Sequence, residues 1–456
     1  MRVLARIALI ALAGALLDEA GLLHGDVVRS PTVPLAVLVV GLVAIALVLL
    51  VLAVRGDGRG DAATPAGPWS HRALRVAWLA VSAAALLGLA WALDPPRPAL
   101  GDVTPYRNDA IAFNECGARL LLHGRDPYTD LDLPACYEQL GIGPDRTTPL
   151  RAGAFATLER YPTDGELEAA WTARLAGRDG GEFVSRLSYP ALTILLVAPA
   201  TRLGWDPNAL YLAFLYAAMA LVTLRARAGL RPFVLTGLFG AACLTTFTAG
   251  GSSDLLYALP LTAAWLWRER GWSGIALGVA VATKQIAWLF IPFFFIAVLT
   301  ECGPRAAWAR GRAALVVFAA TNAPFMLHDG GAWLAGILTP LTASMFPLGA
   351  GLVLLETAGA VPALPAAAHL GLTAAALVGT LAWAWRARRS SPELGVVLAL
   401  LPLFFASRSL FSYFFLIPLF AMAAVARMTA GDLTPGEARD RGALTPLASP
   451  APTVAL

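Results

Sequence analysis

Apolar runs long enough to cross a membrane recur along almost the whole chain. A helix needs about 17–25 apolar residues to span a hydrocarbon core ~30 Å thick, and many of the runs reach this length. Only 14% of the residues are charged and 58% are hydrophobic, whereas soluble domains carry about 25% charged residues. Because helices satisfy their own backbone hydrogen bonds inside a bilayer, the sequence predicts an all-α, polytopic transmembrane helical bundle with about 12–13 spans.

The charges divide the chain into unlike regions. Residues 94–190 contain 15 of the 30 acids and 10 arginines, a net charge of −5, while the remainder has 24 bases and 15 acids, a net charge of +9. Basic loops are typical of the cytoplasmic side, and long acidic loops translocate regardless of charge. We therefore expect residues 94–190 to form an extracytoplasmic loop. The arginines form no stripe interleaved with aromatic residues, so nothing indicates nucleic acid as a partner.

Three parts follow from these patterns. Helices are expected near 3–23 and 33–54, and several runs after residue 190 are shorter than about 17 residues, so they must be tilted, broken or re-entrant. The expected parts are N-terminal transmembrane helices with a cytoplasmic linker (1–73), a membrane module that includes the extracytoplasmic loop (74–427, with 94–190), and a disordered, cytoplasmic tail (428–456).

The loop has helical periodicity over residues 109–122. Its apolar stripe is expected to lie at the bilayer surface and consists of Ile111, Ala118, Leu121 and Leu122. Gly124 to Tyr128 ends this helix, and residues 130–185 predict a small, partly helical insert. Tyr128 is most simply an aromatic residue of the membrane interface.

Asp109 is the leading candidate for chemistry in this loop. A carboxylate just after a membrane exit can take the proton of an acceptor hydroxyl as that hydroxyl attacks a lipid-linked donor. The alternative is a helix N-cap, because Asn108 and Asp109 precede the periodic segment. Four other acids compete for the catalytic role, namely Asp102, Glu115, Asp126 and Glu138.

Lys284 is the single lysine among 34 basic residues. An intramembrane ammonium costs roughly 3 kcal/mol and is a functional hypothesis by default. A lipid phosphate at the leaflet boundary would be its natural partner, whereas the alternative is snorkelling toward an interface. The basic groups flanking the run 274–299 require either two half-crossings, with Lys284 near the far side, or one arginine group outside the cytoplasm.

Two later residues could join this chemistry. Arg408, in Ser-Arg-Ser between two apolar runs, has a planar fork that suits phosphate, although an ordinary loop arginine fits equally well. His328 and Asp329 end the run 313–327 and either bind an acceptor or are solvated loop residues.

The cysteines and acids indicate no metal or cofactor. Cys116 and Cys136 share the polar loop and would pair as a disulfide on an oxidising side, or remain two unpaired small residues. The sequence has no Cys-His metal spacing. Asp130-Leu-Asp132 is better explained as a turn, as is the stretch 250–254.

The order of these features resembles a known family. A membrane helix leads to a large outer loop that opens with an acidic residue and a surface helix. Next come Gly-x-x-Pro-Tyr (124–128), Ser-Tyr-Pro (188–190), a lone lysine in a broken run, and Ser-Arg-Ser (407–409) before Tyr413. Residues 74–427 thereby resemble the GT-C superfamily of membrane glycosyltransferases. The nearest likeness is to the bacterial branch that uses polyprenyl-phosphate-mannose, which includes the mycobacterial phosphatidylinositol-mannoside mannosyltransferase.

The resemblance implies an inverting hexosyltransferase at the outer face of a bacterial plasma membrane. It would transfer a hexose, by this likeness mannose, from a polyprenyl-phosphate-linked donor to a lipid or glycan acceptor. Asp109 would be the general base, and Lys284 and Arg408 would bind the donor phosphate. His328 and Tyr128 would bind the acceptor. The resemblance implies no cofactor, and membrane lipids are the remaining partners.

Two departures from the family pattern are present, and two rival functions remain. Related chains carry Gly-Gln-x-Asn where this chain has Gly251-Ser-Ser-Asp254, and the second proline often found after Tyr189-Pro190 is missing. A multi-pass transporter or lipid flippase would need intramembrane charges along a path, and only Lys284 is clearly placed so. A structural scaffold would need no pocket that joins Asp109 to Lys284.

Overall fold

The computed structural model describes residues 2–29, 31–55 and 108–430. This part of the chain is almost entirely helical, and its single sheet is a parallel pair of two-residue strands. The protein is therefore an all-α helical membrane protein, as the sequence predicts. The expected run 74–93, the competitor Asp102 and the tail beyond residue 430 lie outside the described residues.

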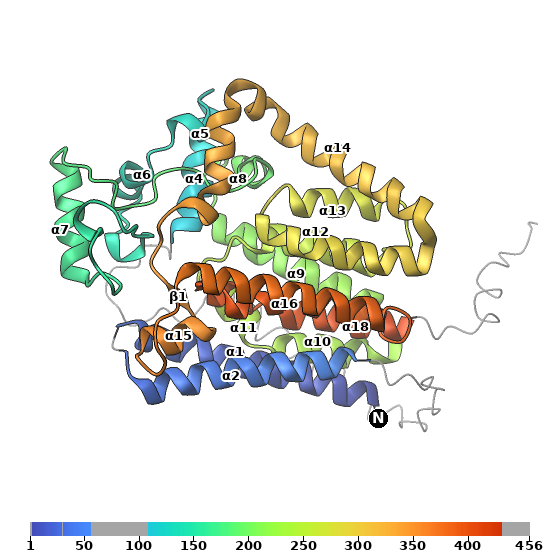
Figure 1. Cartoon of the computed structure of the whole chain (residues 1–456). Helices are drawn as coiled ribbons and strands as arrows, with labels where there is room; N and C mark the ends of the chain where they lie inside the picture. The colour runs from blue at the N-terminus through green and yellow to red at the C-terminus, as the bar shows by residue number, and fades with distance from the viewer. Residues whose placement is uncertain (1, 30, 56–107, 431–456) are drawn as a thin grey trace, which may run out of the picture.

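The helices form a bundle with an insert gathered at one end (Figure 1). The bundle contains α1 (Arg2–Arg29), α2 (Val33–Val54), α8 (Leu192–Arg202), α9 (Pro207–Arg225), α10 (Arg231–Gly240), α11 (Cys243–Ala249), α12 (Leu255–Leu266), α13 (Ser273–Val281), α14 (Phe290–Thr342), α16 (Ala366–Ala387), α17 (Gly395–Leu398) and α18 (Ile417–Ala430). The insert contains α4 (Asp109–Leu122), α5 (Pro127–Asp130), α6 (Leu133–Leu140) and α7 (Asp164–Leu175). Shorter elements are α15 (Leu352–Thr357), strands β1 (Leu348–Gly349) and β2 (Arg408–Ser409), and the 3₁₀ helices η1 (Pro144–Arg146), η2 (Gly153–Phe155), η3 (Ala228–Leu230), η4 (Gln285–Leu289), η5 (Pro392–Leu394), η6 (Leu401–Phe405) and η7 (Phe411–Tyr413).

Five described segments are long and apolar enough to cross a membrane, and they are α2, α9, Gln285–Thr342, α16 and Phe411–Ala430. A sixth arises if Ala228–Gly240 and Cys243–Ala249, bent by 53° at their junction, count as one span. Three further apolar helices are shorter, namely α8, α12 and Pro392–Phe405. Full-length helices in the described chain are thus fewer than the about 12–13 spans expected. One reason is that the apolar run 347–361 folds into β1 and the short α15.

Helix α14 is interrupted twice. Gly303 takes a φ of +81°, and Asp329 takes φ −146° and ψ 90°, so neither residue is helical. Pro304 follows the first interruption and has no N–H to continue the hydrogen-bond ladder. These interruptions separate the part of α14 that starts at Phe290 from the part that ends at Thr342.

Glycines allow α13 and α14 to pack closely. A Cβ on Gly274 would lie 2.5 Å from the Arg310 carbonyl oxygen, and one on Gly278 would lie 2.8 Å from the Ala314 carbonyl oxygen. Small residues one turn apart let membrane helices approach in this way. Between α13 and η4 the backbone leaves the helix at Lys284, so the run 274–299 is broken, as one of its two expected solutions requires.

A buried charge network holds the opposite end of α12. Arg268 is fully buried and donates to both Glu301 and Glu393, the latter at 2.6 Å. Arg427, in the last turn of α18, donates to Glu301 at 2.7 Å and to Glu269 at 2.6 Å. Three acids and two arginines therefore hold α12, α14 and α18 together at this end of the bundle.

Some boundaries and one surface differ from the sequence-based expectation. α1 continues to Arg29, and α18 continues to Ala430, past the expected start of the tail. The expected surface stripe on α4 is wrong for Ile111 and Ala118, which are fully buried inside the protein. The reason is that α8 packs against α4, with Ile194 so close to Gly117 that a Cβ there would lie 2.9 Å from it.

Candidate functional site

Asn108 caps helix α4, so this role does not fall to Asp109. The Asn108 side-chain oxygen accepts a hydrogen bond from the Ile111 backbone N–H at 3.1 Å. Its Nδ2 donates to the Gly251 carbonyl oxygen at 2.8 Å. The same amide therefore caps the start of the helix and ties it to the turn 250–254, far away in the sequence.

Asp109 is the first residue of α4 and is partly buried. Its Oδ1 accepts from the Ala110 backbone N–H at 2.7 Å, and its Oδ2 accepts from the Thr148 hydroxyl at 2.5 Å. Negative charge is favourable at a helix N-terminus. Thr148 was not found by sequence reasoning. The Val184 N–H donates to the Thr148 carbonyl oxygen at 3.1 Å. This backbone hydrogen bond inside the insert holds the residue whose hydroxyl contacts Asp109.

Lys284 lies at the break between α13 and η4, in an extended conformation. Its Nζ lies 2.9 Å from Asp254 Oδ1 and 5.0 Å from the centre of the Tyr189 ring. The side chains of Lys284 and Asp254 are only 14% and 3% exposed, so the lysine faces an internal acid rather than snorkelling outward. Asp254 also belongs to the turn that Asn108 reaches.

Arg408 enters the site from the C-terminal half of the chain. Strand β2 pairs in parallel with β1, with Arg408 opposite Leu348. The Arg408 Nη1 donates to the Phe346 carbonyl oxygen at 3.3 Å. No carboxylate in the described chain forms an ion pair with this guanidinium. A cation with one neutral partner remains able to bind an anion.

Two tyrosines connect these groups electrostatically. The Tyr189 hydroxyl lies within range of Asp109, Asp254 and Arg408, and Tyr413 lies within range of all three and of Lys284. Burial raises the pKa of Tyr189 well above its ordinary value, Asp109 raises it further, and Arg408 opposes the rise. The structure therefore gathers Asp109, Lys284 and Arg408 at one end of the bundle.

Tyr161, from the insert, belongs to the same surroundings. Burial raises its pKa to about 12, while Arg408 acts to lower this pKa and Asp109 to raise it. Its ring packs edge-on against Phe346, whose carbonyl oxygen binds Arg408. The insert therefore covers the end of the bundle where the charges meet.

No known family is matched. Comparisons with protein-family models, curated proteins and solved structures found no match. Function must therefore be argued from the contacts and charges of the site itself.

The two residues expected to bind the acceptor have different surroundings. The His328 side chain is 67% exposed, and its Nε2 lies 3.9 Å from Asp126 Oδ2. Tyr128 is only 4% exposed, and its hydroxyl donates to the Tyr189 carbonyl oxygen at 2.7 Å. Its ring packs edge-on against Phe325. These contacts favour a role for Tyr128 in positioning Tyr189, and they do not support its expected place in an exposed interfacial belt.

The competing acids of the insert have other contacts. Glu115 is buried and accepts from Arg119 at 2.6 Å. Asp126 caps α5 by accepting from the Tyr128 N–H at 2.8 Å. Glu138 is exposed on α6. None of the three acts electrostatically on Tyr189 or Tyr413 to the extent that Asp109 does.

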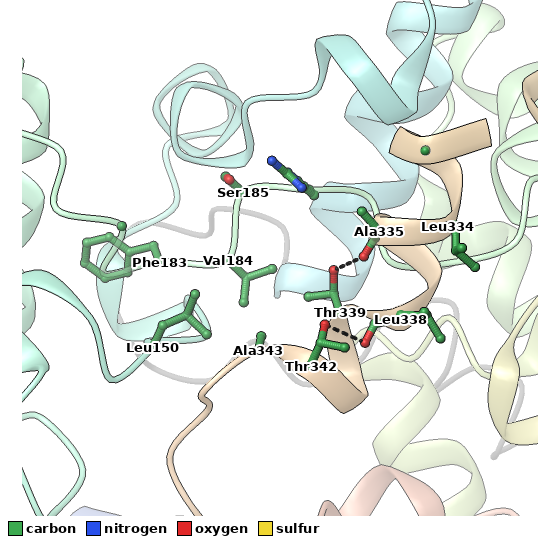
Figure 2. A pocket seen from close by; sticks show the side chains of 13 residues that line it. Leu150, Phe183, Val184, Ser185, Leu334, Ala335, Leu338, Thr339, Thr342 and Ala343 are labelled. Carbon is green, nitrogen blue, oxygen red and sulfur yellow. Dashed lines mark hydrogen bonds between the residues drawn. The ribbon is translucent and has the colours of Figure 1, made fainter. Parts of the chain in front are cut away.

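Two cavities lie within the described chain, and Asp109, Lys284 and Arg408 line neither of them. The larger, about 590 Å³, lies between residues 181–186 of the insert and residues 331–343 of α14 (Figure 2). Its wall includes Val184, which is bonded to the residue that holds Asp109. The smaller, about 290 Å³, is an apolar groove between α13 and α14. Val281 and Trp288 line this groove on either side of the break at Lys284.

A disulfide between Cys116 and Cys136 joins α4 to α6, with their Cα atoms 6.2 Å apart. Of the two alternatives that the sequence left open, the structure therefore has the disulfide. It anchors the helix that carries Asp109 to the body of the insert. Within the described residues, no group of three or more His, Cys, Asp or Glu side chains could hold a metal ion.

Proposed function

We propose that this protein is a GT-C-like glycosyltransferase. It transfers a hexose, mannose by the resemblance, from a polyprenyl-phosphate-linked donor to a lipid or glycan acceptor, with inversion. One observation carries the proposal, namely that a carboxylate and two cations meet around Tyr189 and Tyr413 at the insert end of a membrane bundle. Sugar transfer from a lipid phosphate needs a base and anion-binding groups in one place.

Asp109 would act as the general base. The acceptor hydroxyl gives its proton to the carboxylate, while its oxygen forms a bond to the anomeric carbon of the sugar. The bond between that carbon and the phosphate oxygen breaks, and the electron pair leaves with the lipid phosphate. The hydrogen bond from Thr148 would hold the carboxylate in one orientation.

The cations would stabilise the leaving group. Negative charge builds on the phosphate as the sugar departs, and donors fixed in advance at that position lower the barrier. Arg408 offers a guanidinium without a carboxylate partner in the described chain. Lys284 adds a second positive charge near the same tyrosine, Tyr413.

The disulfide supports an extracytoplasmic site, because disulfides persist on oxidising sides of membranes. On this proposal the insert lies outside a bacterial plasma membrane. The short and broken helices would complete the about 12–13 expected crossings where neighbouring helices satisfy their open backbone groups.

Radiolabelled polyprenyl-phosphate-mannose provides the test, with the full-length protein and a total lipid extract as the source of acceptor. The expected result is transfer of label into an acid-stable glycosidic product. Lys284→Met should raise the KM for the donor, whereas the control Arg125→Met, at an exposed pair with Asp130, should not. Movement of the labelled lipid across liposomes without bond cleavage would instead identify a flippase.

A further inference from the structure

The contact between Lys284 and Asp254 is close but poorly aligned. Nζ and Oδ1 lie 2.9 Å apart, yet Oδ1 has no aligned hydrogen bond to any described residue. The other carboxylate oxygen accepts from the Ser252 hydroxyl at 3.1 Å. The lysine also makes no aligned hydrogen bond in the described chain, and its second contact is the face of the Tyr189 ring. The pair is therefore held by charge and not by an aligned hydrogen bond.

Further polar atoms without partners border Asp254. The Ser253 hydroxyl and the Tyr257 hydroxyl are buried and have no hydrogen-bond partner among the described residues. Tyr257 is fully buried and lies within electrostatic range of Asp254. Buried polar groups are nearly always hydrogen-bonded. Two such hydroxyls beside one carboxylate therefore point to a ligand with several hydroxyl groups.

We infer that Lys284 and Asp254 form an exchangeable ion pair at which the donor binds. The donor phosphate replaces Asp254 as the partner of Lys284, and the released carboxylate accepts hydrogen bonds from hydroxyls of the sugar. Asp254 is thereby a residue that determines recognition of the sugar. This inference rests on the proposed function, because it assigns the phosphate and the sugar of one donor to the two sides of the pair.

The exchange is favoured by the surroundings of each partner. A phosphate would meet two cations, Lys284 and Arg408, both within electrostatic range of Tyr413, whereas Asp254 forms an ion pair with Lys284 alone among the described residues. Hydrogen bonds between charged partners are the strong ones, and an arginine fork can bind phosphate with two of them. Asp254 lies at the N-terminus of α12, where negative charge remains favourable after the lysine is withdrawn.

Asp254→Asn tests the exchange directly. The probe is citronellyl phosphate, a short isoprenyl phosphate without sugar, titrated calorimetrically into the full-length protein in detergent. The variant removes the competing charge, so we expect binding to become at least about tenfold tighter. In the Lys284→Met background, Asp254→Asn should leave the affinity for citronellyl phosphate unchanged. Asp126→Asn is the matched control, because Asp126, like Asp254, is a helix N-cap residue whose carboxylate is largely buried.

Citronellyl-phosphate-mannose tests the sugar side. The ratio of its affinity to that of citronellyl phosphate should fall in Asp254→Asn. Asp254→Glu, which keeps the charge and serves if the asparagine variant does not fold, should keep the phosphate affinity while lowering this ratio. Unchanged phosphate binding in Asp254→Asn, or an unchanged affinity ratio in both variants, would overturn the inference. Asp254 would then be a fixed counter-ion of Lys284, with water bound to the hydroxyls of Ser253 and Tyr257. Binding without sugar does not require transfer, so tighter binding beside absent transfer would uphold the exchange and refute the proposed function.

Discussion

The amide of Asn108 makes two bonds that substitution can separate. Asn108→Ala removes both the cap on Ile111 and the bridge to Gly251. Loss of a cap costs about 1 kcal/mol, and loss of the bridge costs about 1 kcal/mol more. Asn108→Ser keeps a capping oxygen but cannot reach Gly251, so it should lose only the second part. The free energies of unfolding should therefore fall by about 2 and about 1 kcal/mol.

Catalytic activity should depend on the hydrogen bond from Asn108 to Gly251 and not on the helix cap. The bridge fixes Asp109 relative to the turn that holds Asp254, and a 1 Å displacement at a reacting group can lower the rate about 10²-fold. We expect both variants to lose about 10- to 100-fold in kcat/KM for sugar transfer, by similar factors. Thr163→Ala, which breaks the capping box of α7, is the control and should lower stability without lowering kcat/KM. Wild-type kcat/KM in Asn108→Ser would refute the reasoning.

Three further outcomes are expected away from the reacting groups. Reduction of the Cys116–Cys136 disulfide, which joins residues 20 apart, should lower the free energy of unfolding by about 3 kcal/mol; thermal unfolding with and without reductant measures this, and an unaffected midpoint would contradict it. Arg268→Met removes the buried arginine that pairs with Glu301 and Glu393 and leaves Arg427 as their remaining cation. It should cost up to about 3–5 kcal/mol in denaturant titration, and a neutral result would show that the network does not stabilise the bundle. Hydrogen bonds from Arg160 and Thr163 lower the pKa of Glu166 to about 2. The ionised Glu166 therefore stabilises α7 fully above its ordinary pKa of 4.5, and this stabilisation is lost as the pH falls through about 2. Hydrogen exchange of the first amides of α7 should speed up between pH 4.5 and about 2 in the wild type. Glu166→Gln should show no such pH dependence.

Local patterns in the sequence predicted much of the insert and of the break at Lys284. Helical periodicity followed by glycine and proline gave α4 its limits, Asp109 to Leu122. The arginine groups on either side of the run 274–299 allowed either an interruption near Lys284 or one arginine group outside the cytoplasm, and the structure has an interruption. The shared loop of Cys116 and Cys136 allowed either a disulfide or two unpaired cysteines, and the structure has the disulfide.

Contacts between distant segments could not be read in the same way. Thr148 and Asp254 carry no periodic signal, and their roles arise only because the insert and the turn 250–254 fold onto α4. The departure at Gly251-Ser-Ser-Asp254 was visible, but the partner of its acid was not. Full-length helices in the described chain are fewer than the expected spans because apolarity marks burial as well as membrane crossing. Apolar residues such as those of α15 are part of the protein interior or of short helices.

The most direct test of the proposed function compares Asp109→Asn with the wild type. Transfer of label from polyprenyl-phosphate-mannose to the product should fall by about 10²- to 10⁴-fold, the usual contribution of a general base. Donor binding should stay close to that of the wild type, because on the proposed function Lys284 and Arg408 contact the phosphate. Transfer at a near wild-type rate in Asp109→Asn would contradict the assignment of the base.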